Sequence, residues 1–393
     1  MKFVRSVGTC AVMACVTVMG SNFVPGVAWA NESNPKAALK AALEHIISSP
    51  TGPAGAIAIV QHGQSITAIT AGTADFAGSA GPPTASDHVR VASVAKAFSG
   101  AAALALVARH TLALGDTIGK WLPDLPKAWD AVNLGELLNH TSGIPDFSAC
   151  RTFQDAVAAS PLSPPPPQEL LAYVERPPCY RAERSLEFTP GTKYQYSNSD
   201  NVIVGLMIQA ATNQDYSTVL SQTVFQPLGL AQTSLPSSAT MPDPYVHGYA
   251  PDPPGAPLDV TEDIAAGWAW ASGGIVSTPT DANRFVRGYV KGATSNAATR
   301  AKQFHFVEGT SEPPGPGTNS AGLAIFRYRT DCGTVFGHTG NTLGYTQFIA
   351  ASANGQNSVS ISVSGQVTPK ANPTLFPELR QIFELGVCAA MKG

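Results

Sequence analysis

The stretch from Arg90 to Val107 reads RVASVAKAFSGAAALALV, and it carries the strongest structural signal in the chain. Its second half, from Ala97 onward, is apolar nearly all round, which is typical of a helix buried on every side. Ser93 and Lys96 stand three residues apart just before that half, so their side chains would share one helix face. The stretch predicts a buried helix that begins with a serine beside a lysine.

This pair suggests nucleophilic chemistry. A serine hydroxyl is a weak nucleophile unless a base lies beside it, and a lysine can be that base when burial lowers its pKa. The apolar residues around Lys96 favour such burial, so Ser93 is the candidate nucleophile and Lys96 its base. The spacing alone is weak, because Ser33 and Lys36 repeat it by chance. The alternative is a helix cap and a lysine that reaches solvent.

A second motif is Tyr196-Ser197-Asn198. A Tyr196 hydroxyl near the serine could relay its proton, and the Asn198 amide could hold a substrate amide and orient the lysine. The alternative is the capped start of an apolar helix over 202–211. The overlapping Ser199-Asp200-Asn201 offers a second register, and only one register can face the serine.

A third motif is His338-Thr339-Gly340, followed by Asn341. A short strand with glycine lets a substrate lie along its backbone. The backbone N–H of Asn341, together with that of Ser93, could form an oxyanion hole. His338 could donate to a substrate carboxylate or adjust Tyr196. The alternative is a surface histidine in a glycine-rich turn.

In this order and at this wide separation, the three motifs resemble the serine β-lactamase and penicillin-binding-protein superfamily. The likeness is strongest to the actinomycete secreted D-alanyl-D-alanine carboxypeptidase type, which is related to class C β-lactamases. It spans about residues 40–390 and includes Arg90-Val91-Ala92, Leu137 to Pro145 (LLNHTSGIP) and Pro190-Gly191-Thr192. The wide gaps and the absence of Lys-Thr-Gly or Lys-Ser-Gly favour the register of Tyr196 and Asn198.

The resemblance implies an α/β (α+β) fold with an antiparallel five-stranded sheet flanked by helices and an inserted, mainly helical domain. We expect the sheet domain over 31–125 and 266–393 and the helical domain over 126–265. Periodicity predicts helices over 35–48, 97–107 and 376–386 and a hairpin of strands 55–60 and 65–71. Further strands are expected at 89–91, 274–277, 322–327, 334–336, 345–351 and 358–363.

The resemblance also implies a mechanism without cofactor. Ser93 attacks a carbonyl while Lys96 and Tyr196 relay its proton, and water later releases the acyl-enzyme. The residues expected to bind substrate are Asn198, His338, Thr339, Gly340 and Asn341. Two departures affect the substrate: Asn341 replaces the usual threonine, and the basic cluster for a terminal carboxylate is reduced to Arg327-Tyr328-Arg329.

Three functions follow from these residues. The first is a carboxypeptidase that trims acyl-D-Ala-D-Ala ends of cell-wall peptides. The second is a class C-like β-lactamase or an esterase of the same fold. The third is a penicillin-binding sensor without catalysis, against which the presence of every motif residue argues. The expected partner is a small peptide or β-lactam, and we expect a monomer.

The first thirty residues predict export. Lys2 and Arg5 precede an apolar run, and Ala28-Trp29-Ala30 fits a signal-peptidase site, so residues 1–30 form the predicted signal peptide. The run is short for a membrane span and Pro25 interrupts it, so a secreted or periplasmic protein without a stable span is expected. Lipidation at Cys15 is a minor alternative.

Four cysteines remain after such cleavage: Cys150, Cys179, Cys332 and Cys388. An even number in an exported protein favours disulfides, with three possible connectivities. We favour Cys150–Cys179 and Cys332–Cys388, because each pair lies within one plausible structural unit. The histidines and cysteines show no metal-ligand spacing, so no metal site is expected. The net charge of −3 and the lack of a basic tract argue against nucleic acid as a partner.

Overall fold

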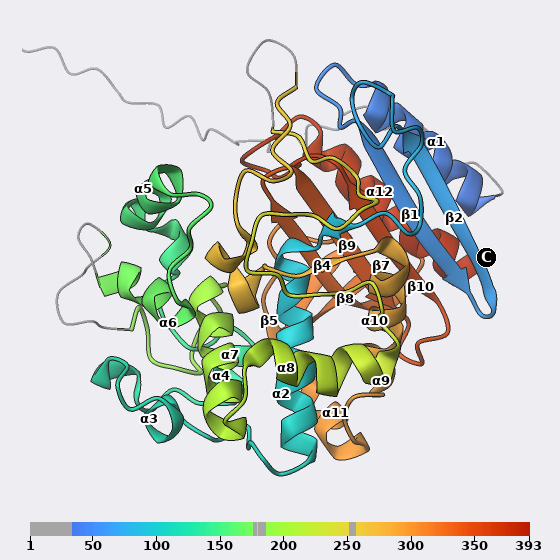
Figure 1. Ribbon diagram of the computed structural model, residues 1–393. Coiled ribbons are helices and arrows are strands. Elements are labelled where there is room, and N and C mark those ends of the chain that lie inside the picture. Colours follow the sequence, from blue (N-terminus) through green and yellow to red (C-terminus); the bar gives the residue numbers. More distant parts are fainter. Residues whose placement is uncertain (1–33, 176–178, 180–185, 251–256) are drawn as a thin grey trace, which may run out of the picture.

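The computed structural model describes residues 34–175, 179, 186–250 and 257–393, so the predicted signal peptide lies outside the described residues (Figure 1). One antiparallel sheet runs through the molecule in the order β2-β1-β10-β9-β8-β7-β6-β5. Its strands are β1 Gly55–His62, β2 Ser65–Gly72, β5 Val307–Glu308, β6 Thr318–Gly322, β7 Ile325–Thr330, β8 Gly333–Thr342, β9 Tyr345–Ala351 and β10 Ser358–Val363. An antiparallel sheet flanked by helices is therefore confirmed, but the described sheet has eight strands instead of five.

Helices cover both faces of this sheet because its central strands are apolar on both sides. Successive side chains of a strand point to opposite faces, and in β9 Phe348 and Ala350 join one core while Ile349 and Ala351 join the other. The first core is closed by α1 (Pro35–Ser48) and α12 (Phe376–Lys392), which pack against each other. The second core contains α2 (Ala95–Ala108) and α10 (Pro279–Lys291).

Most of the remaining helices come from the middle of the chain (Figure 1). They are α3 Ile118–Trp121, α4 Leu134–Leu138, α5 Arg151–Ala159, α6 Pro167–Leu170, α7 Asn198–Thr212, α8 Tyr216–Leu220 and α9 Gln226–Leu228, with α11 Ala297–Gln303 added later in the chain. Helix α7 packs directly on α2. The division into a sheet domain and a helical domain stays a prediction.

Several elements differ from the sequence-based expectation. The predicted strands 89–91 and 274–277 pair with each other as β3 (Val89–Arg90) and β4 (Val276–Ser277), outside the large sheet. Strand β8 is much longer than 334–336, because the Gly-rich residues after Phe336 continue it. Within the described ranges, no helix has the length and apolar character needed to cross a membrane.

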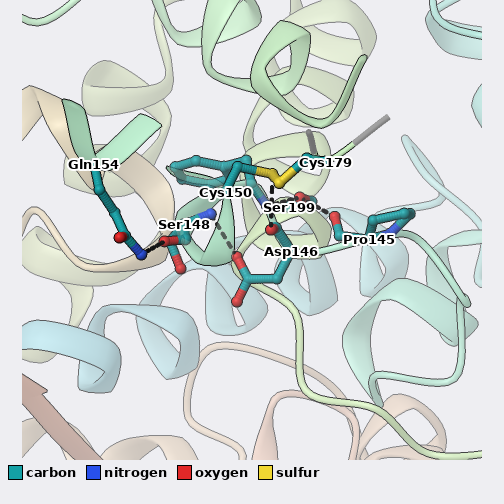
Figure 2. Close-up of a disulfide and its surroundings, with 8 residues drawn as sticks. Pro145, Asp146, Ser148, Cys150, Gln154, Cys179 and Ser199 are labelled. Atoms are coloured by element: carbon teal, nitrogen blue, oxygen red, sulfur yellow. Dashed lines mark hydrogen bonds between the residues drawn. A yellow bond between two sulfur atoms is a disulfide. The ribbon is translucent and has the colours of Figure 1, made fainter. Parts of the chain in front are cut away.

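Both favoured disulfides are present. Cys150 bonds to Cys179, and Cys332 bonds to Cys388 in α12. Cys150 stands between the 3-10 turn η4 (Phe147–Ala149) and α5, so the first bond fixes the start of that helix (Figure 2).

Candidate active site

Ser93 lies in the 3-10 turn η2 (Ala92–Val94) that leads into α2. The preceding residue, Ala92, has a φ of 51°, a left-handed conformation that costs a residue with a side chain about 1–3 kcal/mol. Such strain persists where the surroundings hold the backbone firmly. Here β8 and β9 both pack against the turn, which fixes the direction of the Ser93 side chain.

Lys96 occupies the first turn of α2 and is only 1% exposed. Its Nζ donates to Ser93 Oγ at 3.0 Å, to Asn198 Oδ1 at 2.6 Å and to the backbone oxygen of Ser272 at 2.8 Å. These three acceptors match the three protons of an ammonium group. The amine is thus held at hydrogen-bond distance from the candidate nucleophile.

Burial lowers the pKa of Lys96 to about 7, although the charges of Asp146, Glu312 and Asp200 oppose that change. A buried ammonium loses its hydration, which favours the neutral amine. A lysine with a pKa near neutrality can accept a proton at physiological pH. Lys96 therefore has the chemistry that a general base for Ser93 requires.

We expect the rate of Ser93 acylation to rise with pH through about 7, because only the neutral Lys96 amine can accept the serine proton. Below that pH the rate should fall about tenfold per pH unit as the amine becomes protonated. The measurement is the acylation rate with a p-nitrophenyl ester between about pH 5 and about pH 9. A rate that is flat or falls across this range would contradict the assignment of Lys96 as base.

Tyr196 is buried, and its hydroxyl lies near that of Ser93. Its ring centroid lies 4.9 Å from Lys96 Nζ. Burial raises the pKa of the Tyr196 hydroxyl well above its usual value, while the nearby Ser93 hydroxyl acts in the opposite direction. Tyr196 is therefore a neutral hydroxyl beside the serine, available to donate its proton.

Both asparagines offered by the second motif, Asn198 and Asn201, lie where α7 packs against α2, one helical turn apart. Asn198, the first residue of α7, meets Lys96, and Asn201 donates from Nδ2 to Ser99 Oγ at 2.6 Å one turn further along α2. The structure thus places Asn198, and not Asn201, against the lysine. The helix-start alternative also applies, since α7 begins at Asn198.

Asn198 is held by residues that the sequence patterns did not single out. Its Nδ2 donates to Asp146 Oδ2 and to Ser148 Oγ, both at 2.9 Å. Both acceptors belong to the segment at η4, next to the disulfide of Cys150 (Figure 2). With both amide protons engaged, Asn198 orients Lys96 through its oxygen. The one available signal was that Asp146 directly follows the motif at 137–145.

The His338-Thr339-Gly340 motif lies inside β8, and all three residues are buried. Strand β7 pairs with β8 only as far as Gly337, so the motif pairs with β9 alone, and η2 packs against this part of the sheet. A Cβ on Gly340 would lie 2.5 Å from Val91 O and 3.0 Å from Ser93 N. Glycine is needed here because the strand backbone touches the backbone of the nucleophile turn.

The other motif side chains have defined partners. Thr339 Oγ1 donates to Pro313 O at 2.6 Å, and Asn341 Oδ1 accepts from Gln366 Nε2 at 2.9 Å. Burial lowers the pKa of His338 to about 3, so its ring is neutral. His338 Nε2 has no hydrogen-bond partner in the described part of the chain, and its ring centroid lies 6.5 Å from that of Tyr196.

A buried pair, His140 and Asp200, lies next to the Tyr196 ring. His140 Nδ1 lies 2.8 Å from Asp200 Oδ2, and the His140 ring centroid lies 4.5 Å from that of Tyr196. Burial lowers the pKa of His140 to about 3 and raises the pKa of Asp200. His140 has a φ of 59°, and its backbone oxygen accepts from Gln195 N. His140 belongs to the stretch at 137–145, for which the sequence motifs predicted no role.

A cleft of about 240 Å³ opens at Ser93 and includes Asn198, Ser272 and Asn341 in its wall. Neither Arg327 nor Arg329 lines it, although the sequence suggested them as the carboxylate-binding cluster. Arg327 instead donates to Ser320 Oγ and lies over the Phe306 ring. The arginine that lines the cleft is Arg90, and no group of three metal-binding side chains gathers among the described residues.

The profile of the β-lactamase family matches residues 39–382, which include the three motifs. The chain belongs to the β-lactamase family. This confirms the superfamily that the motifs resemble, and it makes the chain a serine hydrolase of that family. The β-lactamase family includes proteins with several activities, so membership does not define the substrate.

Similar proteins of the β-lactamase family differ in function. The chain is 29% identical to a D-aminopeptidase of Brucella anthropi over 206 residues, 52% of this chain and 37% of the relative. It is 34% identical to esterase EstB of Burkholderia gladioli over 185 residues, 45% of each chain. The matches therefore span less than half of these curated relatives. A D-stereospecific amidohydrolase from a Streptomyces species has a TM-score of 0.75 and 25% identity, covering 88% of this chain and 98% of that one.

Proposed function

We propose that the protein hydrolyses an amide bond at the carbonyl of a D-amino-acid residue, through an acyl-enzyme on Ser93. The observation that carries this proposal is the 3.0 Å contact between Ser93 Oγ and a lysine amine whose burial lowers its pKa to about 7. The preference for D-residues is supported by the names of two similar proteins, the D-aminopeptidase and the D-stereospecific amidohydrolase.

In the proposed reaction, Ser93 Oγ attacks the carbonyl carbon and its proton passes to Lys96 Nζ. That proton reaches the leaving nitrogen through the Tyr196 hydroxyl, and the C–N bond breaks. Water then adds to the ester, Lys96 accepts the proton of the water, and this proton returns to Ser93 Oγ as the acid leaves. The backbone N–H groups of Ser93 and Asn341 would bind the oxyanion, each typically contributing about 10²–10³ in rate.

The leaving group favoured by the cleft is neutral, as in an amide. Arg90, which lines the cleft, donates from Nε and Nη2 to the backbone oxygen of Thr261 at 3.1 and 2.9 Å, and Nη2 also donates to Ala239 O. The Nε and Nη2 groups, which would bind a carboxylate through two parallel hydrogen bonds, therefore already donate to backbone oxygens.

The D-alanyl-D-alanine carboxypeptidase predicted from the sequence is the second candidate. It is favoured by Arg90 Nη1, which keeps no hydrogen-bond partner among the described residues and could meet a terminal carboxylate at one point. A pair of peptides that differ only in a C-terminal carboxylate or carboxamide separates the two candidates. The carboxypeptidase requires faster cleavage of the carboxylate form.

The test of the proposal is intact-mass and product analysis with D-amino-acid amides, diacyl-D-Ala-D-Ala, penicillin and a p-nitrophenyl ester. We expect an adduct on Ser93 and release of a D-amino acid from the amide. Ser93→Ala should abolish adduct and turnover, while Ser217→Ala, on an exposed residue of α8, should change neither. An adduct that survives in Ser93→Ala would overturn the proposal, and rapid penicillin turnover would favour a β-lactamase instead.

Export is also proposed, with the two disulfides as support, because such bonds persist in oxidising compartments. A secreted or periplasmic enzyme would meet small peptides, amides or β-lactams as its partners. The monomeric state stays a prediction, which size-exclusion chromatography with light scattering can test.

A further inference from the structure

Most of the residues that line the cleft beside Ser93 are apolar. Besides Ser93, the polar residues that line it are Arg90, Ser148, Asn198, Ser272, Asn341 and Thr342, and the other side chains are aromatic or aliphatic. The main apolar side chains are Phe147, Phe153, Val157, Ile264, Trp268 and Leu343. Ligand pockets are commonly apolar with a few polar groups that orient the ligand, and this cleft has that composition directly beside the nucleophile.

Helix α5 supplies one wall and has no buried residue of its own. Its apolar side chains Phe153, Ala156 and Val157 share one face and pack against the core only in part. The opposite face carries the exposed ion pair of Arg151 with Asp155. A face that is apolar but incompletely covered, and that borders the serine cleft, is suited to an apolar part of the substrate.

The aromatic residues of the wall form a fixed cluster. The Phe153 ring centroid lies 4.9 Å from that of Phe147, 5.5 Å from Tyr173 and 5.6 Å from Trp268, each in an edge-to-face arrangement. Trp268 Nε1 donates to Ser160 O at 3.3 Å, just after α5. Because the indole N–H already has this hydrogen-bond partner, the Trp268 ring can contact an apolar group of the substrate.

We propose that this wall binds an aromatic or branched apolar acyl side chain, such as a benzyl group, in preference to the methyl group of alanine. The proposal rests on the Ser93 acyl-enzyme. A cavity of roughly 150 Å³ can hold benzene, and the cleft volume is about 240 Å³, so a phenyl ring and its linking atoms fit. A methyl group would leave most of the apolar wall uncovered.

The charges of the cleft agree with an uncharged side chain. Arg90 is the one charged residue among the described cleft-lining residues, and backbone oxygens accept from two of its three nitrogens. A carboxylate or ammonium side chain of the substrate would lose its hydration against Phe153 and Trp268 without gaining a partner there.

The test compares acylation of Ser93 by p-nitrophenyl acetate and by p-nitrophenyl phenylacetate, with the serine adduct confirmed by mass. We expect the phenylacetyl ester to acylate Ser93 at least about tenfold faster than the acetyl ester. A single extra or missing methylene group in an apolar pocket changes the specificity of an enzyme by about 10–200-fold. Val157→Trp, which fills the cleft from the partly exposed face of α5, should remove the preference for the phenylacetyl ester over the acetyl ester.

Ala159→Trp is the matched control, because Ala159 is exposed on the same helix and does not line the cleft. Phe153→Ala is a second variant, which should shift the preference toward still larger acyl groups. Equal acylation by both esters, or an unchanged preference in Val157→Trp, would overturn the proposed pocket. Absence of any Ser93 adduct with either ester would instead overturn the proposed acyl-enzyme.

Discussion

Lys96→Met is expected to lower the rate of Ser93 acylation by about 10²–10⁴-fold, the range that positioned acid–base groups contribute. Methionine keeps the unbranched shape of the lysine stem but has no nitrogen at the position now 3.0 Å from Ser93 Oγ. The serine would then have no neighbouring base, because the Tyr196 hydroxyl stays protonated. The measurement is single-turnover acylation by a p-nitrophenyl ester.

The Lys96 variant should remain folded. Two acceptors, Asn198 Oδ1 and Ser272 O, lose their donor at a cost of about 1–3 kcal/mol each. Removal of a buried cation offsets part of this cost. Lys120→Met is the control, since Lys120 is half-exposed on α3 and pairs with Asp116. Acylation of Lys96→Met at a rate near that of the parent would show that another group takes the serine proton.

Gly340→Ala is expected to have the second-largest effect, a loss of about 10²–10³ in acylation rate, which matches the loss of one oxyanion donor. The added Cβ would lie 2.5 Å from Val91 O and 3.0 Å from the backbone nitrogens of Ser93 and Val94. These are all backbone atoms, so no side chain can rotate away to make room. Strand β8 must therefore move from η2, which separates the N–H groups of Ser93 and Asn341.

Gly115→Ala is the matched control, because a Cβ on Gly115 has no neighbouring atom within 4 Å. Acylation rates and melting temperatures of both variants should be measured together. We expect Gly340→Ala to lose activity at temperatures where circular dichroism still shows native secondary structure. Acylation within about tenfold of the parent rate would mean that this contact does not align the oxyanion donors.

Apolar periodicity predicted the helices and strands whose formation depends mainly on their own residues. The hairpin of β1 and β2 and the helix α1 follow apolar periodicity, and they form where expected. The five-stranded expectation failed at the other edge of the sheet. Residues 318–322 read TNSAG, with little strand propensity, and they form β6 by pairing with β7 on one side and β5 on the other. Most of β8 was also not predicted, because glycine has low strand propensity and β8 contains several glycines.

The candidate site divides in a similar way. Ser93 and Lys96 are neighbours on one helix, so their spacing predicts their contact. The contact of Asn198 with Asp146 and Ser148 depends on how η4 packs against α7, which no spacing reveals. The same limit applies to Arg90, whose place in the cleft follows from the pairing of β3 with β4. Tertiary contacts between distant segments supplied what the motifs lacked.

The contact between Lys96 and Asn198 also has an electrostatic consequence. Both residues lie in the first turn of their helices, so the amino ends of α2 and α7 meet beside Ser93. Each helix carries the equivalent of about half a positive charge at its amino end. Two such partial charges, fixed in place before the reaction, favour the anion that forms on the carbonyl oxygen. The same two charges discourage Lys96 from holding its proton. The junction of two helix dipoles thus assists both the base and the intermediate.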